Sequence, residues 1–174
     1  MEAELVQSPG LVWTVAHVRT RCEKMVASFA ARRGIMHYLP LRRRVQRYQR
    51  RNVETWLPMF NGYLFVRLGE EDHELLAQCH RIIRFFQMTP EREARLLADL
   101  QSVQALERAA LASLVVVVNP ELVAGRSVLI SSGPFRGIRG IVVRRKDATR
   151  VTVNVEMLGQ SVSAELDVGE LEPE

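Results

Sequence analysis

The sequence has little of the chemistry that metal, redox or membrane proteins need. Its two cysteines, Cys22 and Cys79, lie far apart and form no C-x-x-C motif, and the four histidines show no ligand spacing. The longest apolar run, Leu114 to Val118, is far shorter than the roughly 20 residues of a membrane helix. We therefore expect buried free thiols, no metal, no cofactor and no membrane partner.

Two further signals are missing. The acidic N-terminus, MEAELVQSPG, lacks the basic flank and apolar stretch of a secretory signal, so we expect a cytoplasmic protein. No nucleophile has a candidate base nearby in the sequence, and no pair of carboxylates lies in an apolar setting. These absences favour a binding protein over an enzyme.

Charge is distributed unevenly along the 174 residues. Positions 1–112 carry 17 basic and 12 acidic residues, whereas positions 113–174 carry 7 and 8. The excess positive charge therefore lies in the first part, which suggests two domains, the first of which meets an anionic partner.

The first part alternates strand and helix patterns. We expect strands at Leu11–Val18, Ile35–Leu41 and Arg81–Met88, and helices from Cys22, from Glu70 and from Pro90. Thr20 is the expected cap of the first helix, and Gly34 is expected to end it. The expected apolar stripe of that helix is Cys22, Met25, Val26, Phe29 and Ala30.

The stretch PMFNGYLFVRL, from Pro58 to Leu68, predicts a strand with two apolar faces. Leu64, Val66 and Leu68 share one face, and Tyr63 and Phe65 share the other. One face packs on the domain's own helices. The other is either buried as well or kept for a partner.

An arginine run, RRRVQRYQRR, precedes this strand and contains no acidic residue. It cannot be buried, so we expect a projecting hairpin or loop. The run is either a solvated loop or a contact for a nucleic-acid backbone. Its arginines are Arg42, Arg43, Arg44, Arg47, Arg50 and Arg51.

The predicted fold class is α+β, with an N-terminal antiparallel sheet and flanking helices at 1–110. Positions 111–120 form an expected linker. From 121 to 174 the pattern changes to short strands separated by turns, which predicts a small SH3-like β-barrel. The expected strands there are Val128–Ile130, Ile141–Arg144, Val151–Glu156 and Val162–Leu166.

The chain resembles the NusG family of transcription elongation factors over almost its whole length. Trp13-Thr14-Val15, CEKMVA, LPMFNGYLFVRL and RIIRFF resemble the family's N-terminal domain, and ELVAGRSVLISSGPFRGIRGIVV resembles its KOW domain. The sequence LPMFNGYLFVRL resembles the corresponding segment of specialised RfaH-like and capsule-operon antiterminators.

The resemblance implies a monomeric factor that binds the RNA polymerase clamp helices, suppresses pausing or termination, and approaches non-template DNA or nascent RNA. The polymerase-binding positions that it implies are Trp13, Phe60, Tyr63, Phe65 and Phe85. The nucleic-acid-binding positions that it adds to the arginine run are Arg19, Arg21 and Lys24.

The resemblance also implies that the KOW domain recruits a ribosomal protein or Rho through Met157, Leu158 and Gln160. Leu158 stands where housekeeping members carry an aromatic residue, and Gln160 where they carry a basic one. Two alternatives remain: a housekeeping NusG that assists Rho-dependent termination, and an RNA- or ribosome-binding KOW protein that does not act on polymerase.

Overall fold

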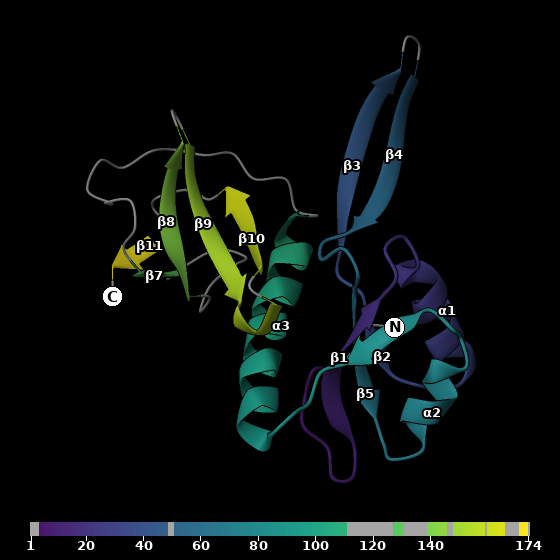
Figure 1. Cartoon of the computed structure of the whole chain (residues 1–174). Coiled ribbons are helices and arrows are strands. Elements are labelled where there is room, and N and C mark those ends of the chain that lie inside the picture. Colours follow the sequence, from purple (N-terminus) through teal and green to yellow (C-terminus); the bar gives the residue numbers. More distant parts are fainter. Residues whose placement is uncertain are drawn as a thin grey trace. The chain divides into compact units, whose positions relative to one another are not determined.

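The computed structural model describes residues 4–48, 51–110, 127–130, 139–145, 148–158, 160–165 and 171–173 (Figure 1). The chain divides into two compact units, residues 1–97 and 98–174, and the division falls within helix α3 (Pro90–Ala110). The linker predicted at 111–120 lies outside the described residues. The domain boundaries drawn from the sequence therefore stay predictions.

A four-stranded antiparallel sheet forms the centre of the first unit. β5 pairs with β1 from Val12 opposite Leu68 to His17 opposite Tyr63, which confirms the first expected strand and the strand from Tyr63. The strand expected at 35–41 is reduced to two residues. The sheet order is β2-β5-β1-β6, with bounds β1 Val12–Val18, β2 His37–Tyr38, β5 Tyr63–Leu68 and β6 Ile82–Phe85.

Helices α1 (Glu23–Arg32) and α2 (Asp72–Ala77) bury one face of this sheet. The alternating side chains expected on one face of β5 are all in this core, which confirms their structural role. Because the buried groups come from two strands and two helices, they form one contiguous cluster. Its members include Ala16, Val18, Val26, Ala27, Ala30, Leu64, Val66, Leu68 and Leu76.

Helix α1 is rotated relative to the stripe predicted from the sequence. Glu23, Val26, Ala27 and Ala30 are buried, whereas Met25 is 46% exposed, so its predicted inward position is wrong. Glu23 takes the inward position because its carboxylate Oε1 accepts the Gly62 N–H at 2.6 Å.

The ends of α1 agree with the prediction at one end only. The predicted cap by Thr20 is wrong: the helix begins after Cys22, and no side-chain cap bond is formed there. The predicted end at Gly34 is confirmed. Gly34 has φ of 73°, a conformation that glycine adopts without strain, and its N–H donates to the Ala31 carbonyl at 3.1 Å.

Helix α3 begins as the sequence predicts. The Thr89 hydroxyl accepts the Arg92 N–H at 3.3 Å, and the same side chain hydrogen bonds to the Glu91 carboxylate, which lowers the pKa of Glu91. The predicted stripe is buried throughout, at Leu96, Leu100, Val103 and Leu106.

Glu93 in the first turn of α3 is buried rather than exposed. Its Oε1 accepts the backbone N–H of Trp13 at 2.7 Å, and its Oε2 accepts the Gln7 side-chain amide at 3.2 Å. The carboxylate thus joins α3 to the N-terminal segment and to β1.

Of the projecting hairpin or loop expected for the arginine run, the structure has the hairpin. Strands β3 (Leu41–Tyr48) and β4 (Arg51–Pro58) pair only with each other among the described strands, from Leu41 opposite Pro58 to Tyr48 opposite Arg51. Figure 1 shows this ribbon extending beyond the four-stranded sheet.

The described part of the second unit contains a five-stranded antiparallel sheet in the order β10-β9-β8-β7-β11. Four of its strands overlap those expected from the sequence, and β11 was not expected. Closure into an SH3-like barrel stays a prediction. The bounds are β7 Ser127–Ile130, β8 Arg139–Arg145, β9 Ala148–Val155, β10 Gln160–Glu165 and β11 Leu171–Pro173.

We expect Glu93→Ala to lower the free energy of unfolding by about 1–3 kcal/mol, because the buried Trp13 N–H loses its acceptor. Glu93→Gln, which keeps an oxygen acceptor, should lose less. Arg95→Ala, on the same helix but exposed, serves as the matched control. Urea unfolding measures all three variants, and equal midpoints for Glu93→Ala and Arg95→Ala would contradict the assignment.

Thr89→Val should remove both hydrogen bonds of the cap and return the pKa of Glu91 toward its ordinary value. Because the folded pKa of Glu91 is depressed, its contribution to stability is present above the unfolded pKa and is lost as pH falls through the folded pKa. The stability difference between wild type and Thr89→Val should therefore shrink on acidification to the cap contribution of about 1 kcal/mol. NMR titration of Glu91 with unfolding at several pH values measures both effects, and a difference independent of pH would argue against the Thr89–Glu91 bond.

Candidate functional site

The predicted polymerase-binding aromatics come from adjacent strands of the sheet. Val15 lies opposite Phe65 and His17 opposite Tyr63, so the odd-numbered residues of β1 and β5 share the face that points away from the α1–α2 cluster. Phe60, just before β5, meets Phe65 edge to face at 5.9 Å. The structure therefore brings four of the five predicted residues, Trp13, Phe60, Tyr63 and Phe65, onto or beside one face.

Burial separates these four residues into two groups. Trp13, Phe60 and Phe65 are fully buried, and the Trp13 indole donates to the Val6 carbonyl at 3.1 Å. Tyr63 is half-buried. In this structure Tyr63 is the accessible ring, and the three buried aromatics form the packing beneath the face.

Phe85 does not lie on this face. It pairs with Ala16 in the register, belongs to the α1–α2 side and meets the His73 ring edge to face at 4.8 Å. Its neighbour Phe86 lies against Tyr63 instead, with ring centroids 6.1 Å apart. Alternation along the strand places Phe85 and Phe86 on opposite faces, but the sequence does not say which of them shares the face of Tyr63. The pairing of β6 with β1 decides this, and its register shifts between His17 and Val18.

The side chains of His17, Tyr63, Phe86 and Arg84 form a continuous row of contacts, which we call the aromatic ladder. His17 stacks on Tyr63 at 5.0 Å with planes 21° apart, Tyr63 meets Phe86 edge to face, and the Arg84 guanidinium lies 4.8 Å from the centre of the Phe86 ring. The three rings are half-buried and Arg84 is exposed.

Gly62 allows the ladder to form. Its φ is 81°, and an added Cβ would lie 3.4 Å from the Val18 carbonyl oxygen and 3.6 Å from the His17 ring. The Gly62 N–H is held by Glu23, so the start of β5 is fixed directly beside His17.

The hairpin arginines differ in their pairing. Arg42 and Arg44 are exposed, opposite Leu57 and Thr55. Arg43 lies opposite Trp56 and forms an ion pair with Glu54, which raises the pKa of Arg43 and lowers that of Glu54, chiefly through their hydrogen bond. Arg47 and Arg51 occupy paired positions farther along the ribbon, and Arg50 lies outside the described residues.

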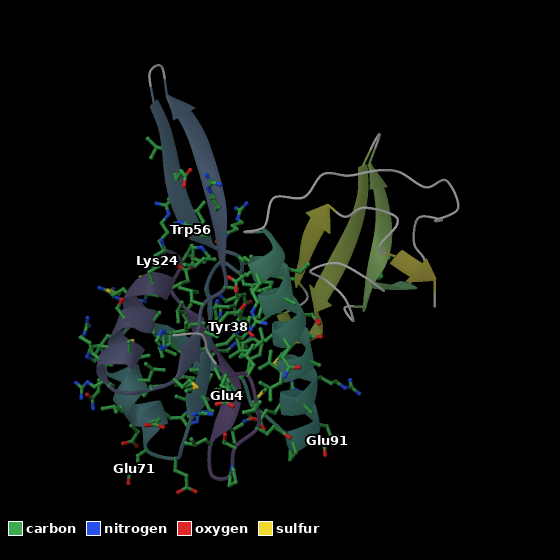
Figure 2. All side chains as sticks on the ribbon, turned by 180° about the vertical axis from the view of Figure 1, so that it is seen from behind. Glu4, Lys24, Tyr38, Trp56, Glu71 and Glu91 are labelled. Carbon is green, nitrogen blue, oxygen red and sulfur yellow. The ribbon has the colours of Figure 1, made fainter. Side chains whose placement is uncertain are left out.

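The second predicted nucleic-acid group adjoins the hairpin. Arg19, Arg21 and Lys24 are all exposed at the junction between β1 and α1. The Lys24 amine donates to the backbone carbonyl of Trp56 on β4, and both residues are labelled in Figure 2. The structure thus links the two sequence-predicted basic groups. Trp56 is 41% exposed and was not selected from the sequence.

The predicted KOW partner positions lie together in the chain of the second unit. Met157 and Leu158 belong to the short 3-10 helix η1 (Glu156–Leu158), and Gln160 begins β10 opposite Val155. All three predicted residues are half-buried.

Within the described ranges, no three His, Cys, Asp or Glu side chains are grouped so that they could hold a metal ion. Cys22 and Cys79 are free and half-buried against the α1–α2 cluster. The described helices include none with both the length and the apolar character to span a membrane.

The chain is similar to known proteins by family model and by fold. The family model described as "Transcription termination factor nusG" matches residues 11–104. The solved structure of Thermotoga maritima NusG, from a study of its domain interaction, matches with a TM-score of 0.57 at 19% identity, over 93% of this chain and 96% of that chain.

Conformation A of the MjSpt4:Spt5 complex also matches, with a TM-score of 0.30 at 18% identity, over 92% of this chain and 96% of that chain. A comparison with curated protein sequences gave no match. The family model covers more than half of the 174 residues, including all four strands of the first sheet. The chain therefore belongs to the NusG family of transcription factors.

Proposed function

We propose that the protein is a non-enzymatic transcription elongation and antitermination factor that binds the clamp helices of RNA polymerase through the aromatic ladder. The observation that carries the proposal is the ladder itself, a row of half-buried rings on a sheet whose other face is already filled by α1 and α2. Aromatic residues with a buried base and an exposed edge are the side chains that most often dominate protein interfaces.

The five predicted polymerase-binding residues take different roles in this proposal. Tyr63 contacts the partner, while Trp13, Phe60 and Phe65 support the face from beneath. Phe86 replaces Phe85, because Phe85 faces His73 on the opposite side of the sheet.

The basic hairpin supplies a nucleic-acid contact in the same proposal. Arg42, Arg44 and Lys24 are exposed, and residues 41–58 contain six arginines against one glutamate. A protein moving with polymerase is always near non-template DNA and nascent RNA, and such a surface neutralises phosphates of either strand. This surplus also supports a specialised RfaH-like or capsule-operon paralog.

The second unit is proposed to recruit another partner through Met157, Leu158 and Gln160, a ribosomal protein or Rho. Its near-neutral charge, with 7 basic and 8 acidic residues at 113–174, supports a protein partner over RNA. For the same reason the alternative of an RNA-binding KOW protein is less well supported.

The double variant Tyr63→Ala/Phe86→Ala should retain at least roughly 10-fold less polymerase than wild type in a pull-down, because two interface rings are truncated. Ile83→Ala is the matched control: Ile83 is 57% exposed on β6 and lies outside the ladder. The variant must first show an unchanged circular dichroism spectrum. A folded double variant that retains as much polymerase as Ile83→Ala would refute the assignment of the surface.

Arg42→Gln/Arg44→Gln should weaken nucleic-acid binding and reduce the slope of log affinity against log salt by about 1.4 for a single strand, since each phosphate contact contributes about 0.7. Arg32→Gln/Arg95→Gln removes the same charge from exposed positions outside the hairpin. Filter binding at several salt concentrations measures both variants. An identical slope for wild type and the hairpin variant would show that Arg42 and Arg44 are solvated and do not contact phosphates.

A further inference from the structure

Trp56 is unusual among the aromatic residues of the first unit. The other tryptophan, Trp13, is fully buried and its indole N–H is hydrogen bonded, whereas Trp56 on β4 leaves 41% of its surface in solvent. An indole has the largest apolar surface of any side chain, so its exposure on a narrow ribbon costs solvation free energy that a bound partner would recover.

Two cationic groups lie beside Trp56, and one of them is paired with a glutamate. Arg43 lies directly opposite it in the hairpin register, held by its ion pair with Glu54. The Lys24 amine is fixed at the Trp56 backbone carbonyl, and an ammonium has three N–H donors, so two stay available for another acceptor.

The reverse side of the ribbon adds to this positive potential. Arg42 and Arg44 lie at the alternate positions of β3 and have no acidic residue opposite them. A two-stranded ribbon is one layer thick, which is less than the Debye length of about 8–10 Å, so charges on both faces act on an anion bound to either face. A partner that binds this ribbon must therefore carry both negative charge and an apolar face in one molecule.

A nucleic acid with unpaired bases meets both requirements. Its phosphates carry the negative charge, and each unpaired base offers an open π face. In a duplex the base faces are covered by stacking on their neighbours, so an indole at the surface of a hairpin cannot reach them.

We propose that Trp56 stacks on an unpaired base of single-stranded nucleic acid, whose adjacent phosphates contact Lys24 and Arg43. This inference rests on the proposed function for the nucleic-acid contact and names the form of nucleic acid that this surface takes. The base contact makes the surface selective for single strands, while the phosphate contacts are independent of sequence.

The two tryptophans allow a direct optical test with the full chain. Adding a short oligothymidylate to wild type should quench the emission of the exposed Trp56. The variant Trp56→Phe keeps only the buried Trp13, whose emission should stay unchanged by the oligonucleotide and should report that the fold is intact.

Affinity gives the second arm of the test. Trp56→Leu keeps an apolar side chain but removes the π face, and should weaken binding of the oligothymidylate by roughly 5- to 150-fold, the effect of losing one stacked base. A duplex of the same length should bind wild type and Trp56→Leu equally. Binding of the oligothymidylate without quenching of Trp56 emission would overturn the stacking assignment. So would equal affinities of wild type and Trp56→Leu for the oligothymidylate.

The polymerase pull-down separates this inference from the proposed function. Trp56 is not part of the aromatic ladder, so Trp56→Leu should retain polymerase as wild type does. If wild type retains polymerase but does not bind the oligothymidylate at low salt, the inference fails and the proposed function stands. Such a result would assign the exposed indole to a protein contact.

Discussion

The first unit depends on two buried carboxylates that accept backbone N–H groups of the sheet. Glu23 accepts from Gly62 and Glu93 accepts from Trp13, and each lies in the first turn of its helix. The pairing of β1 with β6 covers Ala16 to Val18, so the Trp13 N–H lies beyond it and needs another acceptor.

These carboxylates also determine where the candidate surfaces lie. Glu23 fixes Gly62, which places Tyr63 beside His17 at one end of the ladder. The next residue of α1, Lys24, holds the Trp56 carbonyl of the hairpin. Two consecutive residues of one helix therefore position both the proposed protein surface and the proposed nucleic-acid surface, one through a buried bond and the other through an exposed bond.

Patterns of period two and 3.6 were sufficient to predict β1, β5 and the stripe of α3, because apolar spacing follows burial directly. The hairpin was one of two forms expected for the arginine run, and that expectation came from charge that cannot be buried. The patterns failed where a charged residue is buried or a strand is irregular. The buried positions of Glu23 and Glu93 were not predicted, because a carboxylate is rarely buried without a partner, and the partner here is a backbone group far away in the sequence. Phe86, rather than the predicted Phe85, lies on the Tyr63 face because the register between β1 and β6 shifts, and the sequence of one strand does not reveal such a shift.

The hairpin pairs only with itself among the described strands, and this has a consequence for how the length of the ribbon can change. Inserting or deleting one residue in each of β3 and β4 at paired positions near the turn would change the reach of the ribbon and leave the four-stranded sheet and its core untouched. Because side chains alternate with period two, positions nearer the base, including Trp56, would keep their faces. The length of the ribbon is thus free to evolve separately from the fold that carries it.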